Sequence, residues 1–246
     1  MERRRFVRKL VALLLPGGVL GSMMLGRRAH AQQESSSEHY YGMGIQIDKC
    51  IGCGRCVEAC KEENNVPREP FFFRTWVERY EIASNGEVKV TNIEPSLSQR
   101  QEYSEDNRSV RSFFVPKLCN QCDNPPCVQV CPVGATFMTK EGIIIVDDQR
   151  CIGCRYCIQA CPYGARYMHP ATETADKCTF CYHRVSQDLL PACVEVCPSQ
   201  ARIFGDMRRK ASPLTRFKRM NKLHVLKPFL NTEPKVLYAD LDGEVR

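Results

Sequence analysis

Sixteen cysteines in a chain of 246 residues are the side chains most able to do chemistry here. They form four groups of four with none left over. In each group two residues separate the first two cysteines, and three residues separate the last two. The first two groups are Cys50, Cys53, Cys56 and Cys60, and Cys119, Cys122, Cys127 and Cys131. The other two are Cys151, Cys154, Cys157 and Cys161, and Cys178, Cys181, Cys193 and Cys197. Closely spaced thiolates on one loop can converge on one face of an iron–sulfur cubane, so the spacing predicts four [4Fe–4S] clusters.

A proline follows the last cysteine in three groups, at Pro132, Pro162 and Pro198, whereas the first group has Lys61 there. This is the spacing of bacterial ferredoxins, in which the fourth cysteine of one run binds the other cluster of a pair. We expect the three-residue step to lie on a helix that carries the fourth sulfur toward the neighbouring cluster, and the proline to end that helix. The spacing predicts exchanged fourth cysteines without deciding which groups exchange them.

Disulfides and zinc are the two other uses for so many cysteines. Disulfide scaffolds are usually small domains, and they rarely pack three cysteines so closely in four separate runs. Zinc sites use pairs of cysteines joined over longer gaps. Gly52 and Gly153 lie inside the first cysteine pair of their groups, where a glycine lets the backbone approach a sulfide and donate an N–H bond. A simple tight turn would need the same glycines.

Residues 1–31 have the pattern of an export signal. A basic start precedes an apolar run at 10–26 and an A-x-A site at 29–31. Residues 3–8 resemble a twin-arginine motif, so we expect a cleaved twin-arginine signal peptide, a mature chain beginning at Gln32 and a periplasmic location. A membrane anchor is the alternative, although the apolar run is short and rich in glycine.

The net charge of +7 comes mostly from that segment, which holds seven basic residues and one acidic residue. The rest of the chain is nearly neutral, so it lacks the positive charge that would favour nucleic-acid binding. No nucleic-acid partner is therefore expected. No nucleophile–base set or phosphate-binding loop appears, so we expect a chain that is not itself catalytic. No other stretch is apolar enough to span a bilayer, and membrane association is expected through partner subunits.

Three further stretches must position the cysteines. Residues 135–146 are expected to form a short hairpin between groups two and three. The insertion at 70–117 contains two alternating segments around Asn85-Gly86, a strong hairpin signal, with residues 112–115 as a third candidate strand and a polar loop at 95–111. This insertion either shields clusters or docks a catalytic partner. A helix is expected to start at Ser212-Pro213, with a basic face that is either solvated or used for docking.

Four longer motifs, at residues 131–135, 151–157, 160–165 and 191–198, carry a resemblance to a known family. With the four cysteine groups, they make the chain similar to the four-cluster electron-transfer subunits of respiratory membrane complexes. These include the small subunits of polysulfide, tetrathionate, dimethyl sulfoxide and nitrate reductases and of formate dehydrogenase. The resemblance covers about residues 43–205, and its motifs are specific for the cofactor and weakly specific for the substrate.

The resemblance implies an α+β fold of two interlocked bacterial 2[4Fe–4S] ferredoxin-like units, one split and one inserted, with a β-hairpin insertion. The split unit would span 43–69 and 176–205, the inserted unit 118–175, and a C-terminal extension 206–246. The ligand sets of the split unit would be Cys50, Cys53, Cys56 and Cys197, and Cys178, Cys181, Cys193 and Cys60. Those of the inserted unit would be Cys119, Cys122, Cys127 and Cys161, and Cys151, Cys154, Cys157 and Cys131.

In the family that the chain resembles, such a subunit relays single electrons between a catalytic subunit, often with molybdopterin, and a membrane-integral quinone-reactive subunit. We expect the same two partners here, and a multihaem cytochrome is a further candidate. The alternative is a free-standing periplasmic polyferredoxin that shuttles electrons between complexes. The insertion and the C-terminal extension favour a complex.

Overall fold

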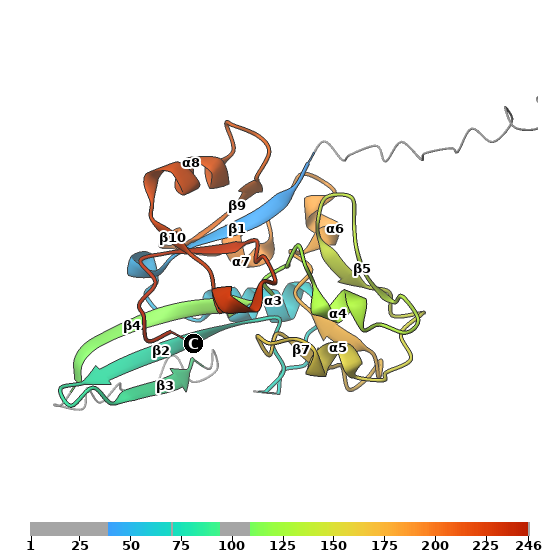
Figure 1. The fold of residues 1–246 in the computed structure, drawn as a ribbon, viewed down its shortest axis with the longest axis horizontal. Coiled ribbons are helices and arrows are strands. Elements are labelled where there is room, and N and C mark those ends of the chain that lie inside the picture. Colours follow the sequence, from blue (N-terminus) through green and yellow to red (C-terminus); the bar gives the residue numbers. More distant parts are fainter. Residues whose placement is uncertain (1–38, 70, 94–108, 246) are drawn as a thin grey trace, which may run out of the picture. The chain divides into compact units, whose positions relative to one another are not determined.

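The computed structural model describes residues 39–69, 71–93 and 109–245 (Figure 1). The expected signal peptide lies outside these residues, and so does most of the expected loop at 95–111. The strands are β1 (Tyr41–Gln46), β2 (Thr75–Ala83), β3 (Val88–Asn92), β4 (Ser109–Leu118), β5 (Thr136–Met138), β6 (Ile144–Val146), β7 (Arg166–Met168), β8 (Ala175–Lys177), β9 (Arg202–Asp206), β10 (Leu223–His224) and β11 (Val236–Ala239). The helices are α3 (Arg55–Glu63), α4 (Pro126–Gln129), α5 (Tyr156–Gln159), α6 (Tyr182–Val185), α7 (Ala192–Glu195) and α8 (Pro213–Met220), with short 3-10 helices η1 (Ile47–Lys49) and η2 (Pro228–Leu230). This mixture of short helices and small sheets agrees with the expected α+β class.

Proline explains the lengths of the helices that carry cysteines. α4, α5 and α7 have four residues each, and each ends two residues before the fourth cysteine of its group. The Cys-Pro pair stops them because proline lacks an N–H and disfavours a helical conformation in the residue before it. α3 has nine residues and continues past Cys60, since Lys61 stands where the others have proline. The expected helical step is confirmed, and in the described ranges no helix is long and apolar enough to cross a membrane.

A four-stranded sheet joins the two ends of the described chain, in the order β10-β11-β1-β9. β1 pairs antiparallel with β9 and parallel with β11, so that Met43 lies between Phe204 and Val236. Met43, Val236 and Tyr238 are fully buried. No pattern in the sequence predicted β11, and part of the segment expected as a C-terminal extension is therefore core structure.

Helix α8 packs against β1 and β9 (Figure 1). It starts as expected, with Ser212 at the N-cap and a proline at the first helical position, where the missing N–H costs nothing. Leu214 and Phe217 form its buried face. Both side chains approach Gly44 of β1 so closely that no side chain would fit there.

Gly44→Ala should therefore destabilise the protein. A Cβ atom at Gly44 would lie 2.5 Å from Cδ1 of the Phe217 ring, and a packed ring cannot yield that space without strain. Overpacking of this kind costs about 1–3 kcal/mol, measurable as a lower denaturant midpoint of the iron-loaded protein. Gly243→Ala is the matched control, because its Cβ would meet nothing within 4 Å. Equal midpoints for the two variants would contradict this packing.

The expected hairpin is confirmed as part of a three-stranded antiparallel sheet in the order β3-β2-β4. Gly86 turns the chain with φ +82°, a left-handed conformation that favours glycine. β4 is longer than the four-residue strand expected, so the end of the expected loop is strand. The hydroxyl of Tyr238 donates a 3.2 Å hydrogen bond to the Pro116 carbonyl, which fastens this sheet to the four-stranded one. Since Cys119 directly follows β4, the sheet also positions the second cysteine group.

Two small hairpins complete the part of the chain that carries the cysteines. β5 pairs with β6, which confirms the hairpin expected between groups two and three. β7 pairs with β8 and connects group three to group four. Each hairpin therefore begins shortly after a Cys-Pro pair and returns the chain to the next cysteine run.

Candidate metal centres

The first cavity collects three cysteines of group one and one of group four. Its walls include Cys50, Cys53, Cys56 and Cys197, together with Arg202. Cys56 lies on α3, and Cys197 follows α7, the helix that packs on α3. The structure thus brings the last cysteine of the chain to the first cysteine run.

The reverse exchange is visible at Cys60. Burial raises the pKa of its thiol well above the usual range, and the nearby thiols of Cys178, Cys193 and Cys181 raise it further. The side-chain amide of Asn64 donates to the sulfurs of both Cys60 and Cys181, each at 3.6 Å. Asn64 is the C-cap of α3. It follows the part of α3 that continues past Cys60 because Lys61 replaces the proline of the other groups. The fourth cysteine of group one therefore lies among the thiols of group four.

Groups two and three also meet. Burial raises the pKa of Cys122 to about 12, with contributions from the thiols of Cys119, Cys127 and Cys161. Cys161 is the fourth cysteine of group three, so the structure places it with the first three of group two. α4 and α5, which carry the third cysteines of these groups, pack against each other.

The last expected set lies nearest the surface. Cys157 is buried beside Cys127 and Ile144, whereas Cys154 is exposed. Cys131 accepts a hydrogen bond from the N–H of Thr136 at 3.5 Å. No contact described for Cys131 joins it to these thiols, so its place in this set stays a prediction.

Backbone N–H groups point at several of the sulfurs. Phe180 donates to Cys178 at 3.4 Å and Ala175 donates to Cys151 at 3.5 Å. Burial raises the pKa of Cys50 to about 11, while the N–H of Gly52 acts in the opposite direction. Gly52 therefore directs its N–H at a cysteine sulfur, with a φ of +69° that favours glycine, and donation to a cluster sulfide stays a prediction.

Three buried cations stand among the thiols, and none of them was predicted from the sequence. Arg166, Lys177 and Arg202 are 5%, 0% and 3% exposed. A repeated motif could have found two, because Ala-Arg follows the Cys-Pro pair at the same spacing in residues 161–166 and 197–202. The corresponding residue after the second group is Thr136.

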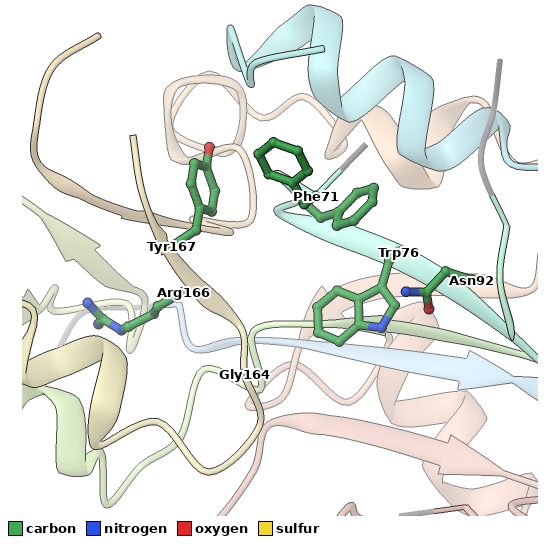
Figure 2. Close-up of a pocket in the computed structure, with 7 residues that line it drawn as sticks. Phe71, Trp76, Asn92, Gly164, Arg166 and Tyr167 are labelled. Carbon is green, nitrogen blue, oxygen red and sulfur yellow. The ribbon is translucent and has the colours of Figure 1, made fainter. Parts of the chain in front are cut away.

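A separate aromatic pocket, lined by Phe71, Phe73, Trp76, Asn92, Gly164, Arg166 and Tyr167, lies beside this region (Figure 2). None of its lining residues is a cysteine. Figure 2 shows the guanidinium of Arg166 directed away from Phe71 and Trp76. Its Nη2 donates instead to the sulfur of Cys127 at 3.0 Å.

The residues present fit iron–sulfur clusters. Within the described chain, no three His, Cys, Asp or Glu side chains converge tightly enough for a single metal ion. Nε of Arg166 and Nη1 of Arg202 are buried beside thiols without a hydrogen-bond partner in the protein. Buried donors of this kind need an acceptor, and cluster or thiolate sulfur would supply one.

Comparisons with known proteins agree with this chemistry. Two families described as 4Fe-4S dicluster domain match residues 49–135 and 110–207. The chain is 44% identical over 213 residues to a tetrathionate reductase subunit of Salmonella typhimurium, covering 86% of this chain and 76% of that protein. It is 47% identical to a tetrathionate reductase subunit of Archaeoglobus fulgidus over 81% of both chains. It is 36% identical to protein NrfC of Escherichia coli over 96% of this chain and 93% of that one. The chain therefore belongs to the 4Fe–4S electron-transfer subunits of respiratory oxidoreductases, and it is not itself a catalytic subunit.

Proposed function

We propose that this chain relays single electrons through four [4Fe–4S] clusters, between a catalytic oxidoreductase subunit and a membrane-integral quinone-reactive subunit. When bound, such clusters supply one-electron oxidation and reduction at potentials set by charge, hydrogen bonds and solvent exposure. The protein's own contribution is to hold the thiolates, exclude water from the inner sites and present the outer sites to partners.

The cavity shared by Cys50, Cys53, Cys56 and Cys197 is the observation that carries the proposal. It supports the exchange of fourth cysteines between groups one and four. Groups two and three then form the second pair, and the ligand sets are the four that the family resemblance implies. In this arrangement a split unit, 43–69 and 176–205, encloses an inserted unit, 118–175, and the two are interlocked.

Two outer faces support a relay between two partners. Ile51 and Ile152 lie in the loops of groups one and three, and they are 61% and 64% exposed. Cys154 is exposed as well, whereas Cys119 and Cys178 are buried. Electrons would enter at one outer set and leave at the other, with the buried sets between them.

The location follows from the N-terminal pattern. We propose that residues 1–31 are a twin-arginine signal, which exports cargo after folding, and that the mature protein works at the periplasmic face of the membrane. The relatives named as tetrathionate reductase subunits make a sulfur-oxyanion reductase the first catalytic partner to test. A multihaem cytochrome is the second.

Affinity purification in mild detergent tests the proposal. The full chain, tagged at its C-terminus and isolated from membranes, should bring down a catalytic subunit and a quinone-reactive membrane subunit, and its N-terminus should be Gln32. Protein that migrates alone after the same extraction would support the free-standing shuttle instead. An intact Met1 on the exported protein would refute the cleaved signal.

A further inference from the structure

Arg166, Lys177 and Arg202 are buried cations that no carboxylate in the described chain neutralises by an ion pair. Other buried cations of this protein do have such partners. Arg79, for example, lies 3.0 Å from Glu81, and Lys235 lies 2.5 Å from Asp123. A buried charge without a partner is strongly unfavourable, so each of the three must face negative charge of another kind. Thiolates, and the iron–sulfur clusters they would hold, supply that charge.

Arg202 stands between the two ligand sets of the split unit. It lines the cavity of Cys50, Cys53, Cys56 and Cys197. Burial acts to lower the pKa of Arg202, but the thiols of Cys56 and Cys193 raise it above its usual range. Cys193 belongs to the set completed by Cys60. Nη2 of its guanidinium donates to the hydroxyl of Thr75 at 2.8 Å, and Nη1 has no hydrogen-bond partner in the protein.

Lys177 stands between the two units. Its Nζ donates to the carbonyls of Ile144 and Cys178, which belong to the inserted and split units respectively. Burial lowers the pKa of Lys177, whereas the nearby thiols of Cys119 on one side and Cys178 on the other act to raise it. Burial raises the pKa of Cys178, and the thiols of Cys193 and Cys119 raise it further. Lys177 therefore contacts both units where they meet.

Arg166 stands between the two ligand sets of the inserted unit. Its Nη2 donates to the sulfur of Cys127 at 3.0 Å. Burial acts to lower the pKa of Arg166, but the thiols of Cys127 and Cys119 on one side and of Cys157 on the other raise it above its usual range. Cys157 belongs to the set nearest the surface. Its Nε, like Nη1 of Arg202, has no hydrogen-bond partner.

We propose that Arg202, Lys177 and Arg166 are positioning residues, one at each junction of consecutive ligand sets, and that each raises the reduction potentials of the two clusters beside it. The proposal rests on the four ligand sets proposed above. If each set is named by the fourth cysteine that completes it, the proposal orders the relay as the Cys197, Cys60, Cys161 and Cys131 sets. The first two belong to the split unit and the last two to the inserted unit.

The physical reason is electrostatic. A cubane with four thiolates is already negative, and reduction adds one more electron to it. A fixed positive charge in a poorly hydrated interior favours the reduced state of the nearest clusters, since charges interact more strongly there than in water. A cation at a junction acts on both of its neighbours, and it also weakens the repulsion between two electrons on adjacent clusters.

Redox titration of the full chain, followed by EPR, tests the proposal with Arg202→Gln, Lys177→Gln and Arg166→Gln. Each variant should lower two of the four midpoint potentials, each by about 59 mV or more, a tenfold change in a one-electron equilibrium constant. Arg202→Gln and Arg166→Gln should shift different pairs, and Lys177→Gln should shift one member of each pair. Arg202→Lys and Arg166→Lys should restore most of the shift, because the charge remains.

Arg79→Gln is the matched control, since Arg79 is similarly buried but paired with Glu81, and it should move no potential. Methionine variants replace any glutamine variant that loses iron, and potentials are compared only at full iron content. Unmoved potentials, or equal shifts of all four, would overturn the cation inference while leaving the relay intact. Fewer than four clusters in the unmutated protein would instead refute the proposed function.

Discussion

Removal of iron from the loaded protein should unfold most of the described chain rather than leave a folded apoprotein. Helices α4, α5, α6 and α7 have only four residues each, far below the roughly 12–15 residues that an isolated helix needs. Nine of the sixteen cysteines are buried, so the clusters would occupy the interior of the fold. In such sites the free energy of metal binding contributes directly to the free energy of folding. For structural zinc in small peptides it is about 10–16 kcal/mol. The free energy of unfolding of a whole domain is of similar size, about 5–15 kcal/mol.

Circular dichroism and hydrogen exchange measure this result after oxidative chelation under thiol-protecting conditions. The loaded protein should unfold cooperatively, whereas the stripped protein should show no cooperative transition and little protection around the cysteine runs. Reconstitution with iron and sulfide should restore both, which controls for chemical damage. A stripped protein that kept a cooperative transition would show that the hydrophobic core is sufficient alone.

Cys60→Ser should prevent a cluster from binding at Cys178, Cys181 and Cys193, although Cys60 belongs to the first cysteine run. Cys197→Ser should do the reverse and empty the site of Cys50, Cys53 and Cys56. Iron should fall from about sixteen to about twelve atoms per chain in each variant. The reason is that α3 and α7 pack together, so that Cys197 lines the cavity of Cys50, Cys53 and Cys56 while Cys60 lies among the thiols of group four.

Alkylation of free thiols followed by mass spectrometry shows which site was lost. In Cys60→Ser the newly reactive thiols should be those of group four, and in Cys197→Ser those of group one. Alanine variants control for serine oxygen acting as a substitute ligand. If Cys60→Ser exposed the thiols of group one instead, each run would hold its own cluster and the two units would not be interlocked.

Local sequence signals predicted the local structure of this protein well. The Cys-Pro pairs marked the ends of α4, α5 and α7, and Lys61 in place of proline accounts for the longer α3. Asn85-Gly86 predicted the turn between β2 and β3. These features depend on a few adjacent residues, so the sequence carries them directly.

Long-range structure was harder to predict because it leaves no local signature. β11 is a four-residue apolar stretch, and so short a stretch cannot be recognised as a strand from its sequence. Its parallel partner β1 lies near the other end of the described chain. Arg166 and Arg202 were missed for a different reason. A single arginine usually marks the surface, and only its repetition at one position after Cys-Pro distinguishes these two buried arginines.

The parallel pairing of β1 with β11 also sets the timing of biosynthesis. Residues 43–46 of β1 pair with residues 236–239 of β11, so β1 lacks this partner strand until roughly 190 more residues have been synthesised. At about 5–20 residues per second, that wait is roughly 10–40 seconds. For most of it, the first thiols have been made but Cys197 has not. The proposed site of Cys50, Cys53, Cys56 and Cys197 can therefore be completed only after that delay, and the first thiols need a reducing environment until Cys197 has been made.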